Sequence, residues 1–170
     1  MKIVEASGFE FQFTDAMDAF IFDEKDHSKP TFHGAPMKSV DIIAEFPAAY
    51  VYVELKNYAD ATIYDPLDAD TRAQQDKFNW LKNYLKYKFR DSYLYRHAEH
   101  KVEKPVHYLC LLTFDNALNS RIQKSLKQEL PVGRVTSRWA QALATSCQVV
   151  NLDKWNENFP KWPVTRLSTI

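Results

Sequence analysis

Residues 38–57 place the tightest constraint on the fold of this chain. They contain two short runs rich in Val, Ile and Tyr, and a turn with Pro47 and Ala48 at its centre separates the runs. Such runs are typical of β-strands, and their close spacing predicts an antiparallel hairpin. With the turn centred there, Ile43 lies opposite Tyr52; a turn of different geometry would change this register.

Three charged side chains are predicted to converge on this hairpin. In the same register Asp41 lies opposite Glu54, and Lys56 shares the face of Glu54 because alternate residues of a strand point the same way. The neighbouring residues are apolar, so a carboxylate there is costly unless a cation compensates it. The pattern therefore predicts a cation site next to an ammonium group.

The expected cation is Mg²⁺, with Mn²⁺ as the alternative, because Mg²⁺ prefers oxygen ligands and keeps several waters. Asp41, Glu54 and the backbone carbonyl of Leu55 would be a sufficient set of protein ligands. Such an ion polarises a phosphodiester and lowers the pKa of a bound water. Lys56 would then orient or deprotonate that water, or stabilise charge developing on the phosphate.

The other segments predict strands that alternate with helices. A single domain over residues 1–170 is expected, of the α/β class, with a central mixed sheet flanked by helices. The expected elements besides the hairpin are a strand at 9–13, a helix at 15–24, a long helix at 71–95, a buried strand at 106–114, helices at 116–130 and 137–144, a strand at 147–152 and an aromatic tail at 155–164.

Asp41, twelve intervening residues and then Glu54-Leu55-Lys56 on an apolar strand resembles the PD-(D/E)XK nuclease superfamily. The resemblance implies a restriction-endonuclease-like core of a helix, three antiparallel strands, a helix and a further strand. Residues 15–114 would form this core, and the remainder of the chain lies outside it. The implied activity is metal-dependent hydrolysis of phosphodiester bonds, in DNA more than in RNA.

The first helix of that superfamily commonly supplies an acidic residue to the site. Asp15, Asp18 and Glu24 compete for this role in the predicted helix, and Asp18 is chosen here. The strand at 9–13 precedes this helix, whereas the superfamily places the helix first. Residues 20–25 are therefore an alternative for the first core strand.

Two further positions bear on the resemblance. Val40 stands where the motif has a proline, a replacement that the superfamily often shows. A branch of the superfamily carries Gln, three residues and then Tyr on the helix after the Glu-x-Lys strand. This chain has Gln74, three residues and then Phe78, which makes Gln74 a further candidate for the site.

The net charge of zero conceals an asymmetry between the two parts of the chain. Residues 1–70 carry 5 Lys and Arg against 14 Asp and Glu, and the remaining residues carry 17 against 8. Basic side chains of the long helix, Lys77, Lys82 and Lys86, are candidates for binding nucleic acid, with aromatic residues between them for base stacking. The alternative is an amphipathic helix with its lysines in water.

Composition restricts the class of protein. Apolar residues make up 45% and charged residues 26% of the chain, as in an ordinary globular protein. The start lacks the pattern of a signal peptide and no segment is long enough to span a membrane, so a cytoplasmic location without membrane contact is expected. Cys110 and Cys147 stand in apolar runs, as buried reduced thiols do.

Two functions therefore follow from the sequence. The first is a Mg²⁺-dependent nuclease, either endonuclease or exonuclease. The second is an inactive module of the same fold that binds nucleic acid or a protein. Zero net charge disfavours strong non-specific binding to nucleic acid by an isolated monomer, so a homodimer or a partner protein is a further expectation.

Overall fold

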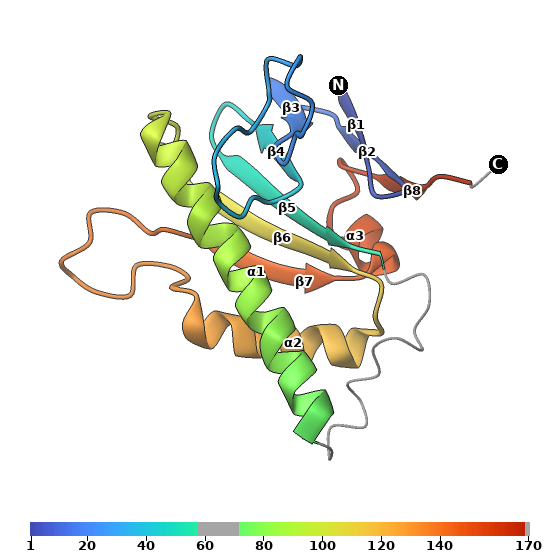
Figure 1. The fold of residues 1–170 in the computed structure, drawn as a ribbon, viewed down its shortest axis with the longest axis vertical. Helices are drawn as coiled ribbons and strands as arrows, with labels where there is room; N and C mark the ends of the chain where they lie inside the picture. Colours follow the sequence, from blue (N-terminus) through green and yellow to red (C-terminus); the bar gives the residue numbers. More distant parts are fainter. Residues whose placement is uncertain (58–71, 169–170) are drawn as a thin grey trace.

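The computed structural model describes residues 1–57 and 72–168, with the backbone alone for residues 72–74 (Figure 1). Eight strands and three helices are found in these residues. In chain order they are β1 (Lys2–Ala6), β2 (Phe9–Phe13), β3 (Asp18–Ile21), β4 (Ile42–Glu45), β5 (Tyr50–Lys56), α1 (Arg72–Ala98), β6 (Val106–Leu112), α2 (Asn116–Glu129), β7 (Ser146–Val150), α3 (Leu152–Asn158) and β8 (Val164–Arg166).

The strands form two sheets. The larger has the order β3-β4-β5-β6-β7, in which β3, β4 and β5 are antiparallel and β5, β6 and β7 are parallel. The long α1 connects β5 to β6, as parallel neighbours require. The smaller sheet has the order β1-β2-β8. The chain is thus a mixed α/β protein, as the sequence predicts.

The larger sheet is covered on both faces, and each face has its own core. Leu81, Leu85 and Phe89 of α1 pack with α2 and one face of β5, β6 and β7. Phe11 of β2 and Trp155 of α3 pack with the other face. Figure 1 shows α1 crossing in front of the larger sheet diagonally, with β1, β2 and β8 at the upper right of the view. Burial on both faces explains why β6 is almost entirely apolar.

The hairpin of β4 and β5 has the predicted register. Ile43 pairs with Tyr52, and Phe46 N–H donates to the Ala49 carbonyl oxygen over 2.8 Å to close the turn. Asp41 directly precedes β4 and donates its N–H to the carbonyl of Val53 over 3.0 Å. The predicted helices at 71–95 and 116–130 and the strand at 106–114 are also confirmed, as α1, α2 and β6.

The predicted helix at 15–24 is wrong, because this segment contains β3. Phe20 pairs with Ile43, and Ile21 pairs with Ile42, so the backbone polar groups are satisfied by β4. The strand at 9–13 is confirmed as β2, but it belongs to the smaller sheet. The first strand of the larger sheet is β3, which shares only its last two residues with the alternative range 20–25.

The predicted helix at 137–144 is also wrong, since these residues form turns and bends. The loop closes where Val132 bridges Ala144, with Gly133 at a positive φ of 77° that a residue with a side chain rarely adopts.

The aromatic tail forms α3 and β8, and its Trp155 is fully buried. Both cysteines are free and buried. None of the described helices is both long and apolar enough to cross a membrane.

Candidate active site

Asp41, Glu54 and Lys56 lie together at the end of the hairpin farthest from its turn. The N–H of Leu55 donates to Asp41 Oδ2 over 2.7 Å, which fixes this carboxylate against β5. Lys56 Nζ is 3.7 Å from Glu54 Oε1. Glu54 is 0% exposed, and the Lys56 side chain keeps 26% of its surface in solvent. The structure thus brings together the three residues that the sequence predicts for the site.

The helix α1 adds a second ammonium group. Lys88 is buried, and its Nζ lies 3.6 Å from Glu54 Oε2 and donates to the Ser39 carbonyl oxygen over 2.6 Å. Lys88 is not among the residues that the sequence predicts for the site, because the lysines of this helix are interpreted there only as a basic surface or as solvated side chains. The available signal was its position three residues after Leu85 and four before Ser92, both buried. This spacing puts Lys88 on the face of the helix toward the sheet.

Tyr84, one turn before Lys88 on α1, holds the other lysine. Lys56 Nζ donates to the Tyr84 hydroxyl oxygen over 2.8 Å and lies 4.2 Å from the centre of the ring. A lysine side chain has many rotamers, and an ammonium held over an aromatic face and bonded to its hydroxyl loses much of that freedom. Lys56 is therefore positioned before any substrate binds.

The two carboxyl groups of the site are buried where their charged forms are disfavoured, although two lysines lie near them. Burial raises the pKa of Glu54 well above its usual value, and the neighbouring Asp41 adds to this, while Lys88 and Lys56 oppose it. Burial also raises the pKa of Asp41, against the Leu55 hydrogen bond and the two lysines. Within the described residues, neither carboxylate oxygen of Glu54 has a hydrogen-bond partner. Such a buried group calls for a further cation.

The donors present fit a hard divalent cation. A residue in a strand presents its N–H and C=O to the same neighbour, so the Leu55 carbonyl faces the side on which Asp41 lies. Two carboxylates and one carbonyl are oxygen ligands of the kind that Mg²⁺ and Mn²⁺ accept. In residues 1–57 and 72–168, no group of three His, Cys, Asp or Glu side chains gathers to hold a metal. The remaining ligands would be waters and substrate oxygens, as is common for Mg²⁺.

The segment after β3 brings a different acidic residue, Asp23, close enough to act on this group, whereas the predicted Asp18 lies elsewhere. The charge of Asp23 is among the causes that raise the pKa of Asp41. Asp23 accepts hydrogen bonds from the Ser39 hydroxyl and from Lys25, which hold its own pKa below the usual value although burial opposes them. Sequence reasoning omitted Asp23 because it sought the acidic residue on a helical face.

Asp18 lies away from the site. It pairs with Glu45 at the opposite end of β3 and β4, and its nearest cation is Lys2, with Nζ 3.8 Å from its carboxylate. Because β3 is extended, Asp18 and Asp23 are separated by the whole length of the strand, whereas a helix would have kept them about one and a half turns apart. Gln74 lies in α1, but its side chain is outside the described residues.

The predicted nucleic-acid contacts on α1 separate into two groups. Lys82 and Lys86 face α2 and form ion pairs with Glu129, with N–O distances of 2.6 Å and 2.7 Å. Lys77 is exposed. The two paired lysines hold α1 against α2, and Glu129 compensates their charges.

The ion pairs of Glu129 predict a stability change at low pH. Hydrogen bonds from Lys82 and then Lys86 lower the pKa of Glu129 to about 2, from an ordinary value of 4.5. Because the folded state has the lower pKa, this stabilisation is present above about pH 4.5 and is lost as the pH falls toward about 2. Glu129→Gln should lower the free energy of unfolding by less than about 1 kcal/mol at neutral pH, since the pair is partly solvated.

Urea unfolding of wild type and Glu129→Gln from neutral to acidic pH measures this effect. The difference between the two proteins should shrink over that acidic range. The matched control is Glu157→Gln, which removes an exposed ion pair within α3 and should change stability less. A difference that persists undiminished near pH 2 would contradict the assignment.

Comparison with known proteins gives no match: no family model, no curated protein and no solved structure resembles this chain within the limits of significance. Its function is therefore inferred from the chemistry of Asp41, Glu54, Lys56 and Lys88.

Proposed function

We propose that this protein is a divalent-metal-dependent nuclease of the PD-(D/E)XK superfamily, with DNA as the favoured substrate and RNA as the alternative. The observation that carries the proposal is the buried Glu54 carboxylate. It has no hydrogen-bond partner among the described residues and lies with Asp41 and Lys56 on the strand end where that motif requires them. A carboxylate so placed is costly to the fold, which is typical of a functional site.

Asp41, Glu54 and the Leu55 carbonyl would hold Mg²⁺ or Mn²⁺. When bound, the ion supplies Lewis-acid polarisation of the phosphodiester and lowers the pKa of a coordinated water. Lys56, partly exposed and held by Tyr84, orients the attacking water or donates to a phosphate oxygen as negative charge develops there. Lys88 is too deeply buried for such contact; its charge opposes the rise in the pKa of Glu54, and the ion pair holds that side chain in position.

The order of elements supports membership of this superfamily. The meander of β3, β4 and β5, followed by α1 and by β6 parallel to β5, reproduces five of the six elements of the expected core. The departure is the missing leading helix. The hairpin of β1 and β2 precedes β3 instead, and this hairpin packs against the face of the sheet opposite α1.

A second function is favoured by the charge balance of the same site. Lys56 and Lys88 already place two ammonium groups near Asp41 and Glu54, so the number of positive charges equals the number of carboxylates. A cluster of that kind can persist without a metal ion. The corresponding function is an inactive module of the same fold that binds nucleic acid or a protein partner.

The test is cleavage of plasmid and single-stranded DNA in Mg²⁺, in Mn²⁺ and in EDTA. Wild type should cut in the presence of either metal and not in EDTA. Asp41→Asn should lower the rate by about 100-fold or more, because it removes a charged ligand. Asp18→Asn is the matched control, an exposed aspartate at the opposite end of β3, and it should retain full activity.

Binding of Mn²⁺, followed by its electron paramagnetic resonance spectrum, separates the two functions. A nuclease requires Mn²⁺ to bind to wild type and to Asp18→Asn, and more weakly to Asp41→Asn. Absence of both cleavage and Mn²⁺ binding in wild type would overturn the nuclease proposal and favour the inactive module.

A further inference from the structure

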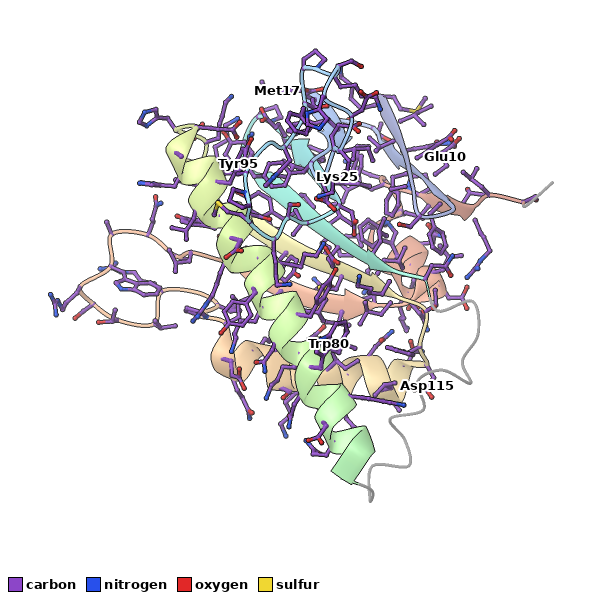
Figure 2. The ribbon with its side chains drawn as sticks, viewed as in Figure 1. Glu10, Met17, Lys25, Trp80, Tyr95 and Asp115 are labelled. Carbon is purple, nitrogen blue, oxygen red and sulfur yellow. The ribbon has the colours of Figure 1, made fainter. Side chains whose placement is uncertain are left out.

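Trp80 is an exposed aromatic residue that neither core explains. It is 58% exposed on α1, in the half of the helix nearer its start, and Figure 2 labels it there. Its indole stacks on the ring of Tyr84, one helical turn later, with ring centroids 5.1 Å apart and an interplanar angle of 21°. Stacking on one side leaves part of the indole surface accessible to a ligand.

The partner of this stack belongs to the candidate active site. The ring of Tyr84 lies near three ammonium groups, with Lys56, Lys88 and Lys38 at 4.2, 5.1 and 5.2 Å from its centre. Lys38 is exposed, and its backbone N–H donates to Asp91 of α1, which anchors the segment before β4 against the helix. From the surface toward the site, the exposed ring of Trp80 is thus followed by the ring of Tyr84 and then by the lysine ammonium groups around it.

This combination fits one class of ligand. A nucleobase offers a π face to an aromatic side chain, and the phosphate next to it offers negative charge to lysines. Bases within a duplex are stacked on both faces and paired at their edges, so their faces are not available to an indole. An unpaired base satisfies both requirements, and stacking accepts any of the bases.

We propose that Trp80, supported by Tyr84, stacks an unpaired nucleobase, while Lys38 contacts an adjacent phosphate. The nuclease site would thereby favour single-stranded nucleic acid, or a single-stranded segment at the end of a duplex. The inference rests on the proposed function and specifies its substrate class.

The rival for an exposed aromatic residue is an apolar surface for a protein partner. Trp80, Tyr87 and Leu94 follow one another at intervals of seven residues on α1, and all three are exposed. Leu94 is also 58% exposed, so it matches Trp80 in exposure, but it lies away from the lysines around Tyr84. The lysines favour nucleic acid, and Leu94 provides the control that separates the two ligands.

The experiment measures fluorescence anisotropy of a labelled oligothymidylate of about 15 nucleotides and of a duplex of equal length. Ca²⁺ replaces Mg²⁺ so that binding is read without cleavage. Trp80→Ala should raise the Kd for the single strand by about 10-fold or more, and Trp80→Phe should recover most of the affinity. The Kd for the duplex should change less than about 2-fold, because Trp80 is expected to make no direct contact with paired bases.

The control Leu94→Ala should leave the Kd for the single strand unchanged. The inference is overturned if Trp80→Ala has no effect, if it weakens single strand and duplex equally, if Leu94→Ala weakens binding as much, or if wild type binds no single strand. These results are independent of catalysis. If single-strand binding depends on Trp80 but no cleavage occurs in Mg²⁺, the nuclease proposal is rejected and stacking of a base on Trp80 is kept. If the protein cleaves duplex DNA equally well with and without Trp80, the nuclease proposal is kept and the stacking proposal is rejected.

Discussion

Lys56→Ala is expected to lower the rate of metal-dependent cleavage by about 10²–10⁴-fold, the usual contribution of a group that assists proton transfer or charge stabilisation in the transition state. The affinity for the metal should change much less, because Lys56 is not a ligand. Glu54 loses one of its two cationic neighbours in the described part of the chain but keeps the buried Lys88, 3.6 Å away, and Lys56 is partly exposed, so the loss of stability should be smaller than for removal of Lys88 and the fold should be retained. Single-turnover cleavage at saturating Mg²⁺ measures the chemical step directly.

Two variants control this experiment. Lys56→Met nearly keeps the length of the side chain without its charge. If the ammonium group is required, this variant should cleave as slowly as Lys56→Ala. Lys82→Ala removes a partly buried lysine that is paired with Glu129 on the α2 side of the helix, and it should keep the wild-type rate. Cleavage by Lys56→Met at the wild-type rate would remove Lys56 from the mechanism.

Lys88→Met is expected to lower the free energy of unfolding by about 3 kcal/mol in EDTA, because breaking a buried ion pair on one side leaves a buried charge without compensation. Glu54 is fully buried and, among the described residues, would keep only Lys56, 3.7 Å away, as a cationic partner. The Ser39 carbonyl would also lose the donor that now lies 2.6 Å from it. Urea unfolding of both proteins measures the difference.

The assignment of this cost to Glu54 is tested by a double variant. Glu54→Gln removes the negative charge, so adding Lys88→Met to it should cost clearly less than in wild type, with a coupling of about 1 kcal/mol or more. Mg²⁺ should restore part of the stability of Lys88→Met and none of that of the double variant, since binding to the folded state stabilises it. Equal costs of Lys88→Met with and without Glu54 would show that the two side chains act independently.

The part of the site that could be predicted lies on one hairpin. The register of β4 and β5 follows from a turn near Pro47, and once it is set, strand geometry brings Asp41, Glu54 and Lys56 together. These contacts are local in sequence. Lys88 comes from α1, and its contact with Glu54 depends on how the helix rotates and crosses the sheet, which the hairpin does not determine. A lysine at a buried helical position was the available signal.

The errors have a common physical origin. The sequence predicts a helix over residues 15–24, but a segment this short fits either period, and pairing of Phe20 and Ile21 with β4 decided in favour of a strand. Likewise, the ion pairs of Lys82 and Lys86 with Glu129 depend on where α2 lies against α1, which the sequence of α1 alone does not determine. In each case the structure of a segment depends on its contacts with other segments, which the sequence of that segment alone does not determine.

The smaller sheet joins two parts of the chain that are far apart in sequence. Phe11 of β2 pairs with Val164 of β8, and both lie in the core on the side of the larger sheet that α1 does not cover. During synthesis on the ribosome, the layer formed by α1 and α2 can assemble before the last strand emerges. The opposite layer is incomplete until then, because β2 lacks its strand partner until translation has passed Val164. Folding of this protein is therefore completed from one side of the sheet to the other, and the exposed aromatic face of β2 is the surface that chaperones would meet in the meantime.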